Sequence, residues 1–178
     1  MEVKLENLTT REKIGQMFMV GMDVADCVKY IDELILKYKI GGILLYKKNY
    51  NSYKDALELI NHIKEINKNN KIPIFIATDQ EGGRVNRMPD EFENIPSAHK
   101  LAQYKKEDLV SESAQITANM LKTLGFNFNL APVLDIKRFS DNHAIGDRAY
   151  SETPEEVGKY GIEYMKKIKK LFDPNNII

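Results

Sequence analysis

The sequence predicts an α/β protein made of parallel βα units. Four short apolar runs alternate with longer segments of helical spacing, at intervals of roughly 25 to 55 residues, as strands and crossover helices do. Polar or charged residues follow these apolar runs. The ends of strands are the positions at which α/β proteins place their functional side chains. Two architectures fit: a doubly wound sheet, or part of a (β/α)8 barrel, of which four units are half. We expect all 178 residues, 1–178, to form a single domain.

Each element is predicted from local signals. Thr9 and Glu12 have capping-box spacing, Ser52 is placed to cap a helix, Pro154 stands at a first helical position, and Gly125 ends a helix. The predicted elements, in order, are a short helix after Thr9, a strand at 17–22, a helix at 24–39 in which Cys27 serves for packing, a strand at 43–46, a helix at 52–69, a strand at 72–78, a helix at 107–124, a strand within 126–136 and a helix at 154–171. Residues 88–103 form a polar stretch with no predicted element.

Composition excludes several function classes. The chain has 26 basic and 26 acidic residues, so bulk charge favours neither nucleic acid nor an anionic membrane as a partner. One cysteine and three histidines argue against an intrachain disulfide and a structural zinc site. We expect no metal and no cofactor, because no nucleotide-binding glycine motif occurs either. The N-terminus lacks an apolar signal region and no apolar run is of membrane-spanning length, so we expect a cytoplasmic protein.

The segment IATDQEGGRVNR, residues 76–87, is the first candidate site. An apolar strand ends there in Asp79 and Glu81, and two glycines precede Arg84 and Arg87. The glycines permit a sharp turn or close approach to a ligand. Carboxylates accept hydrogen bonds from vicinal hydroxyls, and arginine presents a fixed fork of donors. The alternative is that the acid caps a helix or binds loop amides, but the whole group favours a polar-ligand site.

A second polar group follows the fourth predicted strand. Asp135 stands where that strand ends, and His143 and the turn Gly146-Asp147-Arg148 come after it. The alternative function for this turn is an aspartate–arginine brace of the loop. The motifs of zinc proteases and serine hydrolases are absent, so neither activity is supported.

Four motifs in order, GGILLY, IATDQEGGRVNR, LGFNFNLAPVLDI and HAIGDRAYSETPEEV, resemble the N-terminal barrel of family three glycoside hydrolases. Within that family they are most similar to bacterial β-N-acetylhexosaminidases. The resemblance runs from about residue 8 to about residue 170 and implies the N-terminal half of a (β/α)8 barrel. It also implies a retaining hydrolysis of O-glycosidic bonds of N-acetylglucosamine-containing sugars, with a nucleophilic aspartate and a separate acid/base.

The resemblance assigns roles residue by residue. Asp79 matches the aspartate that holds sugar hydroxyls, Arg87 and Arg148 match arginines that contact the sugar, and Arg84 is expected to support its loop. The branch's KHFPGHG motif, which precedes the histidine acid/base, is not in this sequence, and neither is the nucleophile, which lies further on. We therefore name no catalytic residue, because none of Asp135, Asp147 and Glu81 occupies the nucleophile position.

These matches and departures give a functional expectation. The chain carries the substrate-binding half of a glycosidase of β-N-acetylhexosaminidase type, and alone it should hydrolyse little or nothing. The alternatives are a non-catalytic sugar-binding or assembly module, or a truncated fragment without function. A half-barrel also leaves strand edges unpaired, so we expect self-association, a complementing chain, or marginal stability.

Overall fold

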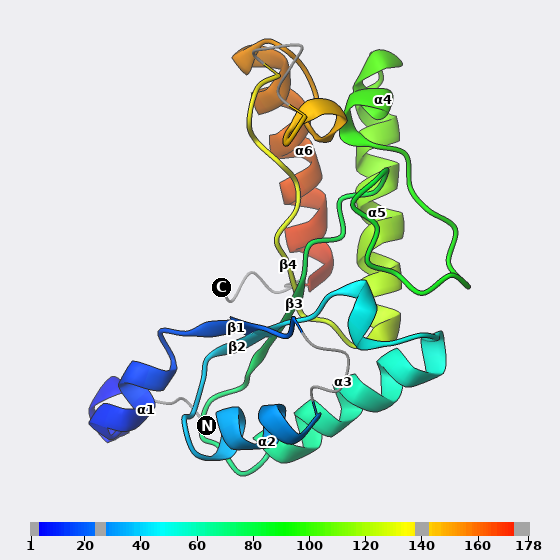
Figure 1. The fold of residues 1–178 in the computed structure, drawn as a ribbon. Helices are drawn as coiled ribbons and strands as arrows, with labels where there is room; N and C mark the ends of the chain where they lie inside the picture. The colour runs from blue at the N-terminus through cyan, green and yellow to red at the C-terminus, as the bar shows by residue number, and fades with distance from the viewer. Residues whose placement is uncertain (1–3, 24–27, 138–142, 173–178) are drawn as a thin grey trace. The chain divides into compact units, whose positions relative to one another are not determined.

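The computed structural model describes residues 4–23, 28–137 and 143–172 (Figure 1). The elements along the chain are η1 (Leu5–Asn7), α1 (Thr10–Gly15), β1 (Met19–Gly21), α2 (Val28–Leu36), β2 (Gly42–Leu44), η2 (Lys47–Asn49), α3 (Tyr53–Asn67), β3 (Phe75–Thr78), α4 (Ala98–Gln103), α5 (Glu107–Leu124), β4 (Phe128–Asn129), η3 (Gly146–Arg148) and α6 (Pro154–Phe172).

The chain divides into two compact units. The sheet unit holds the described residues up to Thr78, together with Pro89–Glu91 and Leu124–Asn129. The helical unit holds Asp79–Met88, Phe92–Thr123 and the described residues from Leu130 onward. All four strands belong to the sheet unit, whereas the residues of the candidate site all belong to the helical unit.

The four strands form one parallel sheet in the order β1-β2-β3-β4. Its register aligns Val20 with Ile43 and Ile43 with Ile76, and Ala77 with Phe128. The strand order follows the chain without reversal, as in a (β/α)8 barrel, whereas a doubly wound sheet reverses at a switch point. The predicted α/β fold is confirmed, and of the two architectures the N-terminal half of a (β/α)8 barrel is the observed one.

The two faces of this sheet differ. On one face, isoleucines of β2 and β3 are buried, and so are isoleucines of α2 and α3, two helices that pack against each other (Figure 1). These fully or almost fully buried residues are Ile31, Ile35, Ile43, Ile60, Ile63 and Ile76. Alternate strand residues point to the opposite face. There Met19, Phe75 and Phe128 are about two-fifths exposed, and the two phenylalanine rings lie 5.3 Å apart.

The helical unit has its own core, made by α4, α5, α6 and the segment before α6. Its buried members are Leu101, Ala102, Val110, Ala114, Tyr150, Val157, Tyr160 and Tyr164. The rings of Tyr150 and Tyr160 lie 5.8 Å apart. Burial raises the pKa of the Tyr150 hydroxyl above its ordinary value, with a smaller contribution from Tyr164, so Tyr150 stays neutral.

The predicted helices lie close to the observed ones, and α5 begins and ends where it was predicted. The capping box of α1 is formed as expected, and Ser52 caps α3 by accepting a hydrogen bond from the Asp55 amide. The prediction for residues 88–103 was incomplete, because α4 begins there after its N-cap Ser97. A helix of six residues has too few turns to show helical spacing in the sequence. Cys27 lies outside the described residues.

Candidate functional site

The site begins at the carboxyl end of β3, where a tight turn follows the strand. Gly82 and Gly83 have φ angles of 87° and 57°, a region that other residues rarely adopt. The Val85 amide donates to the Gly82 carbonyl, and the Gly83 amide donates to the Ile95 carbonyl at 2.7 Å. A Cβ atom on Gly82 would lie 2.7 Å from that same carbonyl oxygen. Both glycines are therefore required by the sharp turn, as the sequence predicted, and Gly82 is also required by its close approach to the Ile95 carbonyl, which the sequence did not indicate.

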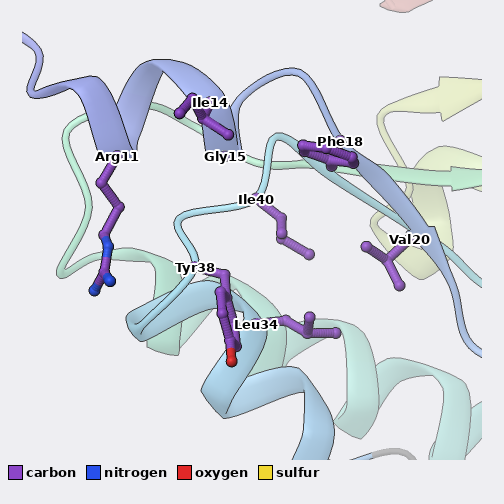
Figure 2. A pocket seen from close by; sticks show the side chains of 8 residues that line it. All are labelled: Arg11, Ile14, Gly15, Phe18, Val20, Leu34, Tyr38 and Ile40. Atoms are coloured by element: carbon purple, nitrogen blue, oxygen red, sulfur yellow. The ribbon is translucent and has the colours of Figure 1, made fainter.

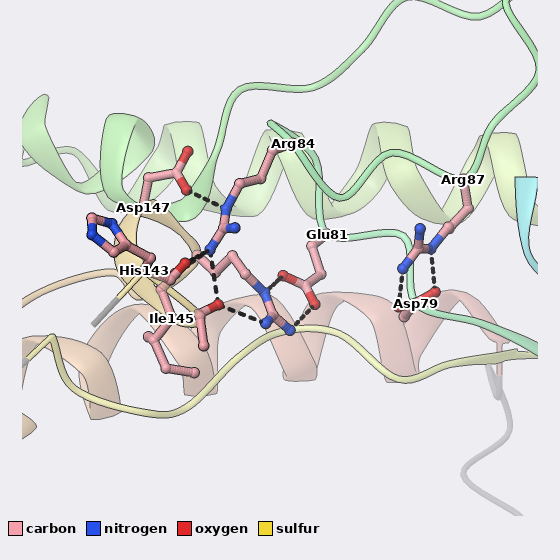
Figure 3. A network of polar contacts seen from close by, with 9 residues as sticks. Asp79, Glu81, Arg84, Arg87, His143, Ile145 and Asp147 are labelled. Atoms are coloured by element: carbon pink, nitrogen blue, oxygen red, sulfur yellow. Dashed lines mark hydrogen bonds and ion pairs between the residues drawn. The ribbon is translucent and has the colours of Figure 1, made fainter. Parts of the chain in front are cut away.

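Asp79 and Arg87 form an ion pair within this loop. The Arg87 Nε and Nη2 atoms each donate to one carboxylate oxygen of Asp79, both at 2.6 Å (Figure 3). The Arg87 amide also donates to the side-chain oxygen of the fully buried Gln80. The side chains of Asp79 and Arg87 are 23% and 27% exposed, so the pair is mostly buried but remains accessible to solvent. This arrangement fixes an acceptor and a donor fork side by side.

Glu81 and Arg148 form a second pair of the same geometry, between residues that are far apart in the sequence. Arg148 donates through Nε and Nη2 to the two oxygens of Glu81, at 2.8 and 2.7 Å. The Glu81 side chain is only 10% exposed. Its hydrogen bond raises the pKa of Arg148 above the ordinary value, against the effect of burial, and the charges of Glu81, Asp79 and Asp135 add to the increase. Arg148 therefore carries a permanent positive charge among carboxylates.

Arg84 joins the same two loops by a different set of contacts (Figure 3). Its Nε donates to Asp147 at 2.9 Å, and its Nη2 donates to the carbonyls of His143, Ala144 and Ile145 at 2.8, 2.8 and 3.1 Å. The expectation that Arg84 supports its loop is confirmed. The alternative considered for the Gly146-Asp147-Arg148 turn, an aspartate–arginine brace, exists in a different form: Asp147 pairs with Arg84 and not with its neighbour Arg148.

The structure brings the sequence-predicted site residues together, some through their side chains and His143 through its backbone. Asp79, Arg87 and Arg148 all lie in the helical unit, and the loops that carry them are joined by the pair of Glu81 and Arg148 and by Arg84. His143 enters the network through its backbone carbonyl. The partnership of Glu81 with Arg148 was not predicted. Its only signal in the sequence was that both residues follow predicted strands, whose carboxyl ends meet at one edge of a parallel sheet.

The arrangement suits polar, uncharged ligands with several hydroxyl groups. Arginine only donates and carboxylate only accepts, so a fixed pair offers both functions at one place. Within residues 4–23, 28–137 and 143–172, no cluster of three or more histidine, cysteine, aspartate or glutamate side chains is suited to hold a metal ion. Over the same residues, no helix combines the length and apolar character needed to cross a membrane.

Comparison with known proteins identifies the family. The model of the glycosyl hydrolase family 3 N-terminal domain matches residues 9–171. A Beta-hexosaminidase of Photobacterium profundum is 36% identical over 139 residues, which are 78% of this chain and 40% of that protein. Beta-hexosaminidase LpqI of Mycobacterium tuberculosis is 30% identical over 165 residues, 91% of this chain and 40% of that protein. The chain thus spans less than half the length of these curated relatives.

Solved structures agree. A glycoside hydrolase family 3 β-N-acetylglucosaminidase from Paenibacillus sp. superimposes with a TM-score of 0.86 and 30% identity, over 92% of this chain and 31% of that one. NagZ from Neisseria gonorrhoeae, in complex with N-trifluoroacetyl-D-glucosamine, gives a TM-score of 0.76 and 25% identity, over 86% of this chain and 47% of that one. With the family model spanning nearly the whole sequence, the chain belongs to the glycosyl hydrolase family 3 N-terminal domain family.

Proposed function

We propose that this chain carries sugar-binding residues of a glycoside hydrolase of β-N-acetylhexosaminidase type. The reaction is hydrolysis of O-glycosidic bonds in N-acetylglucosamine-containing sugars, with retention of configuration. The support comes from family membership and from relatives named Beta-hexosaminidase, each of which this chain covers only in part. The sugar itself enters the proposal through one relative, whose structure contains a trifluoroacetyl glucosamine.

The observation that carries the proposal is the pair of Asp79 and Arg87 at the carboxyl end of β3. Both oxygens of the carboxylate are oriented by the guanidinium, and each keeps further acceptor capacity toward solvent. Two neighbouring hydroxyls of a sugar ring present two donors at a spacing that such a carboxylate accepts. We assign Asp79 to the sugar hydroxyls and Arg87 to the sugar oxygens beside them. Arg148, positively charged and paired with Glu81, is the third sugar-binding residue.

Binding without turnover is the activity we propose for the chain alone. A retaining glycosidase needs a nucleophilic carboxylate and an acid/base group on either side of the scissile bond. The carboxylates of the site, Asp79, Glu81 and Asp147, are each bonded to an arginine, an arrangement that makes them acceptors and positioning groups. A non-catalytic sugar-binding role therefore uses the same residues as the proposed glycosidase subsite.

Titration of the isotope-labelled chain with N-acetylglucosamine, followed by amide chemical shifts in NMR spectra, tests this proposal. We expect saturable shifts within residues 79–88 and 143–148. Replacing one charged acceptor of a hydrogen bond costs roughly 1.5–3 kcal/mol, so Asp79→Asn should weaken binding about tenfold or more. Arg148→Ala should weaken it by a similar factor.

Asp90→Asn is the matched control, because the Asp90 side chain is 86% exposed and pairs with Lys47 in the sheet unit. Equal affinities of Asp79→Asn and Asp90→Asn, or the absence of saturable shifts, would contradict the assignment. An assay with an aryl N-acetylglucosaminide addresses catalysis separately. Turnover that is abolished by Asp79→Asn would show that the chain hydrolyses sugar by itself.

A further inference from the structure

The polar loop after β3 differs in character from the hollow beside β1 in the sheet unit. That hollow has a volume of about 530 Å³, and most of its lining is apolar, with Arg11 and Tyr38 as the polar members (Figure 2). The loop after β3 instead presents Asp79 and Arg87, joined by two hydrogen bonds of 2.6 Å (Figure 3). Because an arginine side chain is long and flexible, the loop must hold Arg87 in place to keep this pair formed.

Gln80 is the buried side chain of this loop. It is fully buried, whereas the side chains of its neighbours Asp79 and Glu81 keep some exposure. The alternation is that of an extended chain, in which successive side chains point to opposite sides. Gln80 is therefore directed into the protein, and the two acids are directed toward their arginine partners. A buried amide is costly unless it forms hydrogen bonds, so the contacts of Gln80 matter.

The side-chain oxygen of Gln80 holds the backbone of Arg87. The Arg87 amide donates to Gln80 Oε1 at 2.6 Å. The backbone hydrogen bonds of the turn join residues 81–85, since the amides of Glu81 and Gly82 both donate to the Val85 carbonyl. The contact with Gln80 carries this support two residues further along the chain, to the residue whose side chain enters the site.

Three links close a ring through Asp79, Gln80 and Arg87. The first is the peptide bond between Asp79 and Gln80, and the second is the hydrogen bond from the Arg87 amide to Gln80. The third is the ion pair that returns from the Arg87 guanidinium to Asp79. The ring holds the Arg87 side chain at both ends. Fixing its backbone reduces the number of arrangements from which the guanidinium must find the carboxylate.

A neutral acceptor suits position 80. A carboxylate there would stand beside Asp79 and Glu81 and would attract the Arg87 guanidinium, because charged acceptors bind it more strongly than neutral ones. The amide oxygen of glutamine accepts from a backbone N–H without adding a charge. The two neighbouring residues therefore have separate roles: Gln80 holds the backbone of Arg87, and Asp79 holds its side chain.

We propose that Gln80 is the positioning residue of the sugar site, which rests on the sugar-binding function proposed above. Gln80 is fully buried and acts through Arg87. Its hydrogen bond to the Arg87 amide keeps Asp79 and Arg87 in their two-bond pair before a sugar binds. The pair is then ready to bind, and little of the binding free energy is lost in ordering it.

NMR spectroscopy of the isotope-labelled variant Gln80→Met tests this role. Methionine has a similar length and tolerates burial, but it removes the acceptor for the Arg87 amide. Without sugar, hydrogen exchange at the Arg87 Nε–H should become about tenfold faster, because the pair opens more often. The Arg148 Nε–H, which donates to Glu81 at 2.8 Å, is the internal control and should exchange as in the parent. The affinity for N-acetylglucosamine should fall about tenfold.

Gln103→Met is the matched control variant, because it makes the same chemical change at an exposed position of α4 in the helical unit. It should keep the exchange rates and the affinity of the parent. Unchanged exchange at Arg87 in Gln80→Met would overturn the proposal. Equal acceleration at Arg87 and Arg148 would also overturn it, because Gln80 would then support the whole unit and not the pair.

A second variant, Gln80→Asn, decides the outcome if Gln80→Met does not fold. Asparagine keeps the amide but is one methylene shorter, so it should lose the contact with Arg87 and give the same selective acceleration. If circular dichroism shows both variants unfolded, Gln80 serves the fold and the proposal is wrong.

The sugar titration separates this proposal from the proposed function. A parent chain that does not bind N-acetylglucosamine contradicts the sugar-binding function, and hydrogen exchange at Arg87 still shows whether Gln80 holds the pair. A parent chain that binds the sugar, with an unchanged affinity in Gln80→Met, contradicts the role of Gln80 alone.

Discussion

The sheet unit and the helical unit each have a buried apolar core, but they differ in where their ion pairs lie. In the sheet unit, a parallel backbone ladder and fully buried isoleucines define the structure, and its lysine ion pairs lie on the surface, such as Lys37 with Glu33 at 54% and 51% exposure. In the helical unit, arginines join the loop after β3 to the segment that contains η3. There Arg148 and Glu81 are 28% and 10% exposed.

This difference shows where charge matters to the structure. An exposed lysine pair contributes roughly 0–1 kcal/mol, because water screens it and both side chains lose freedom. A side-on arginine–carboxylate pair with restricted exposure fixes the orientation of both groups. Loops that must present polar groups to a ligand cannot rely on apolar packing, so the arginines serve as their internal support.

The largest effect should follow from truncating the core of the sheet unit. Ile60 on α3 is fully buried, so Ile60→Ala removes buried methylene groups and leaves a cavity. We expect the free energy of unfolding to fall by about 2–5 kcal/mol. Urea unfolding followed by circular dichroism measures the loss. Ile116→Ala on the exposed face of α5 should stay within about 0.5 kcal/mol of the parent, and equal losses would contradict the assigned core.

A smaller effect should follow from breaking the loop contacts of the helical unit. Glu81→Gln keeps the shape of the side chain but removes the charge that pairs with Arg148, and we expect a loss of about 1–3 kcal/mol. Asp147→Asn does the same to the more exposed pair with Arg84, where the two side chains are 45% and 47% exposed. That loss should be below about 1 kcal/mol. If Asp147→Asn costs as much as Glu81→Gln, burial does not set the strength of these pairs.

Much of the sheet unit could be predicted from the sequence, for a physical reason. Apolar runs of four to six residues and helical spacing are local signals, and they placed β2, β3 and α3 near their observed positions. Strand order is not local, so two architectures remained open until the pairing of β1 to β4 was observed. The strand β4 has only two residues, too short for its bounds to be predicted.

In the candidate site, the loops could be predicted from the sequence but most of the contacts between them could not. Residue types identified the loops that carry Asp79 and Arg148, because acids and arginines beside glycines after a strand are typical of the functional loops of α/β proteins. The partners could not be predicted, since Glu81 and Arg148 are 67 residues apart and Arg84 contacts Asp147 across 63. Such pairings depend on where two loops meet in space, and the adjacent Asp147 and Arg148 gave a misleading local alternative.

The smallest effect we predict concerns the charge of Glu12 at the N-terminal end of α1 in the sheet unit. Glu12 accepts from the Thr9 amide at 2.7 Å and from the Thr9 hydroxyl, and Lys71 lies 3.2 Å away. These contacts, the backbone bond first, lower its pKa from 4.5 to about 2. Because the pKa of Glu12 is lower in the folded state than in the unfolded state, its carboxylate stabilises the folded state above pH 4.5. This contribution to stability disappears as the pH falls from 4.5 toward 2. Glu12→Gln should therefore lower the melting temperature by a small amount at pH 7, and this difference should shrink to zero near pH 2. The control is Glu58→Gln, at the exposed pair with Lys54, which should change the melting temperature less at pH 7. A Glu12→Gln difference that is constant with pH would show that the cap acts through shape and not through charge.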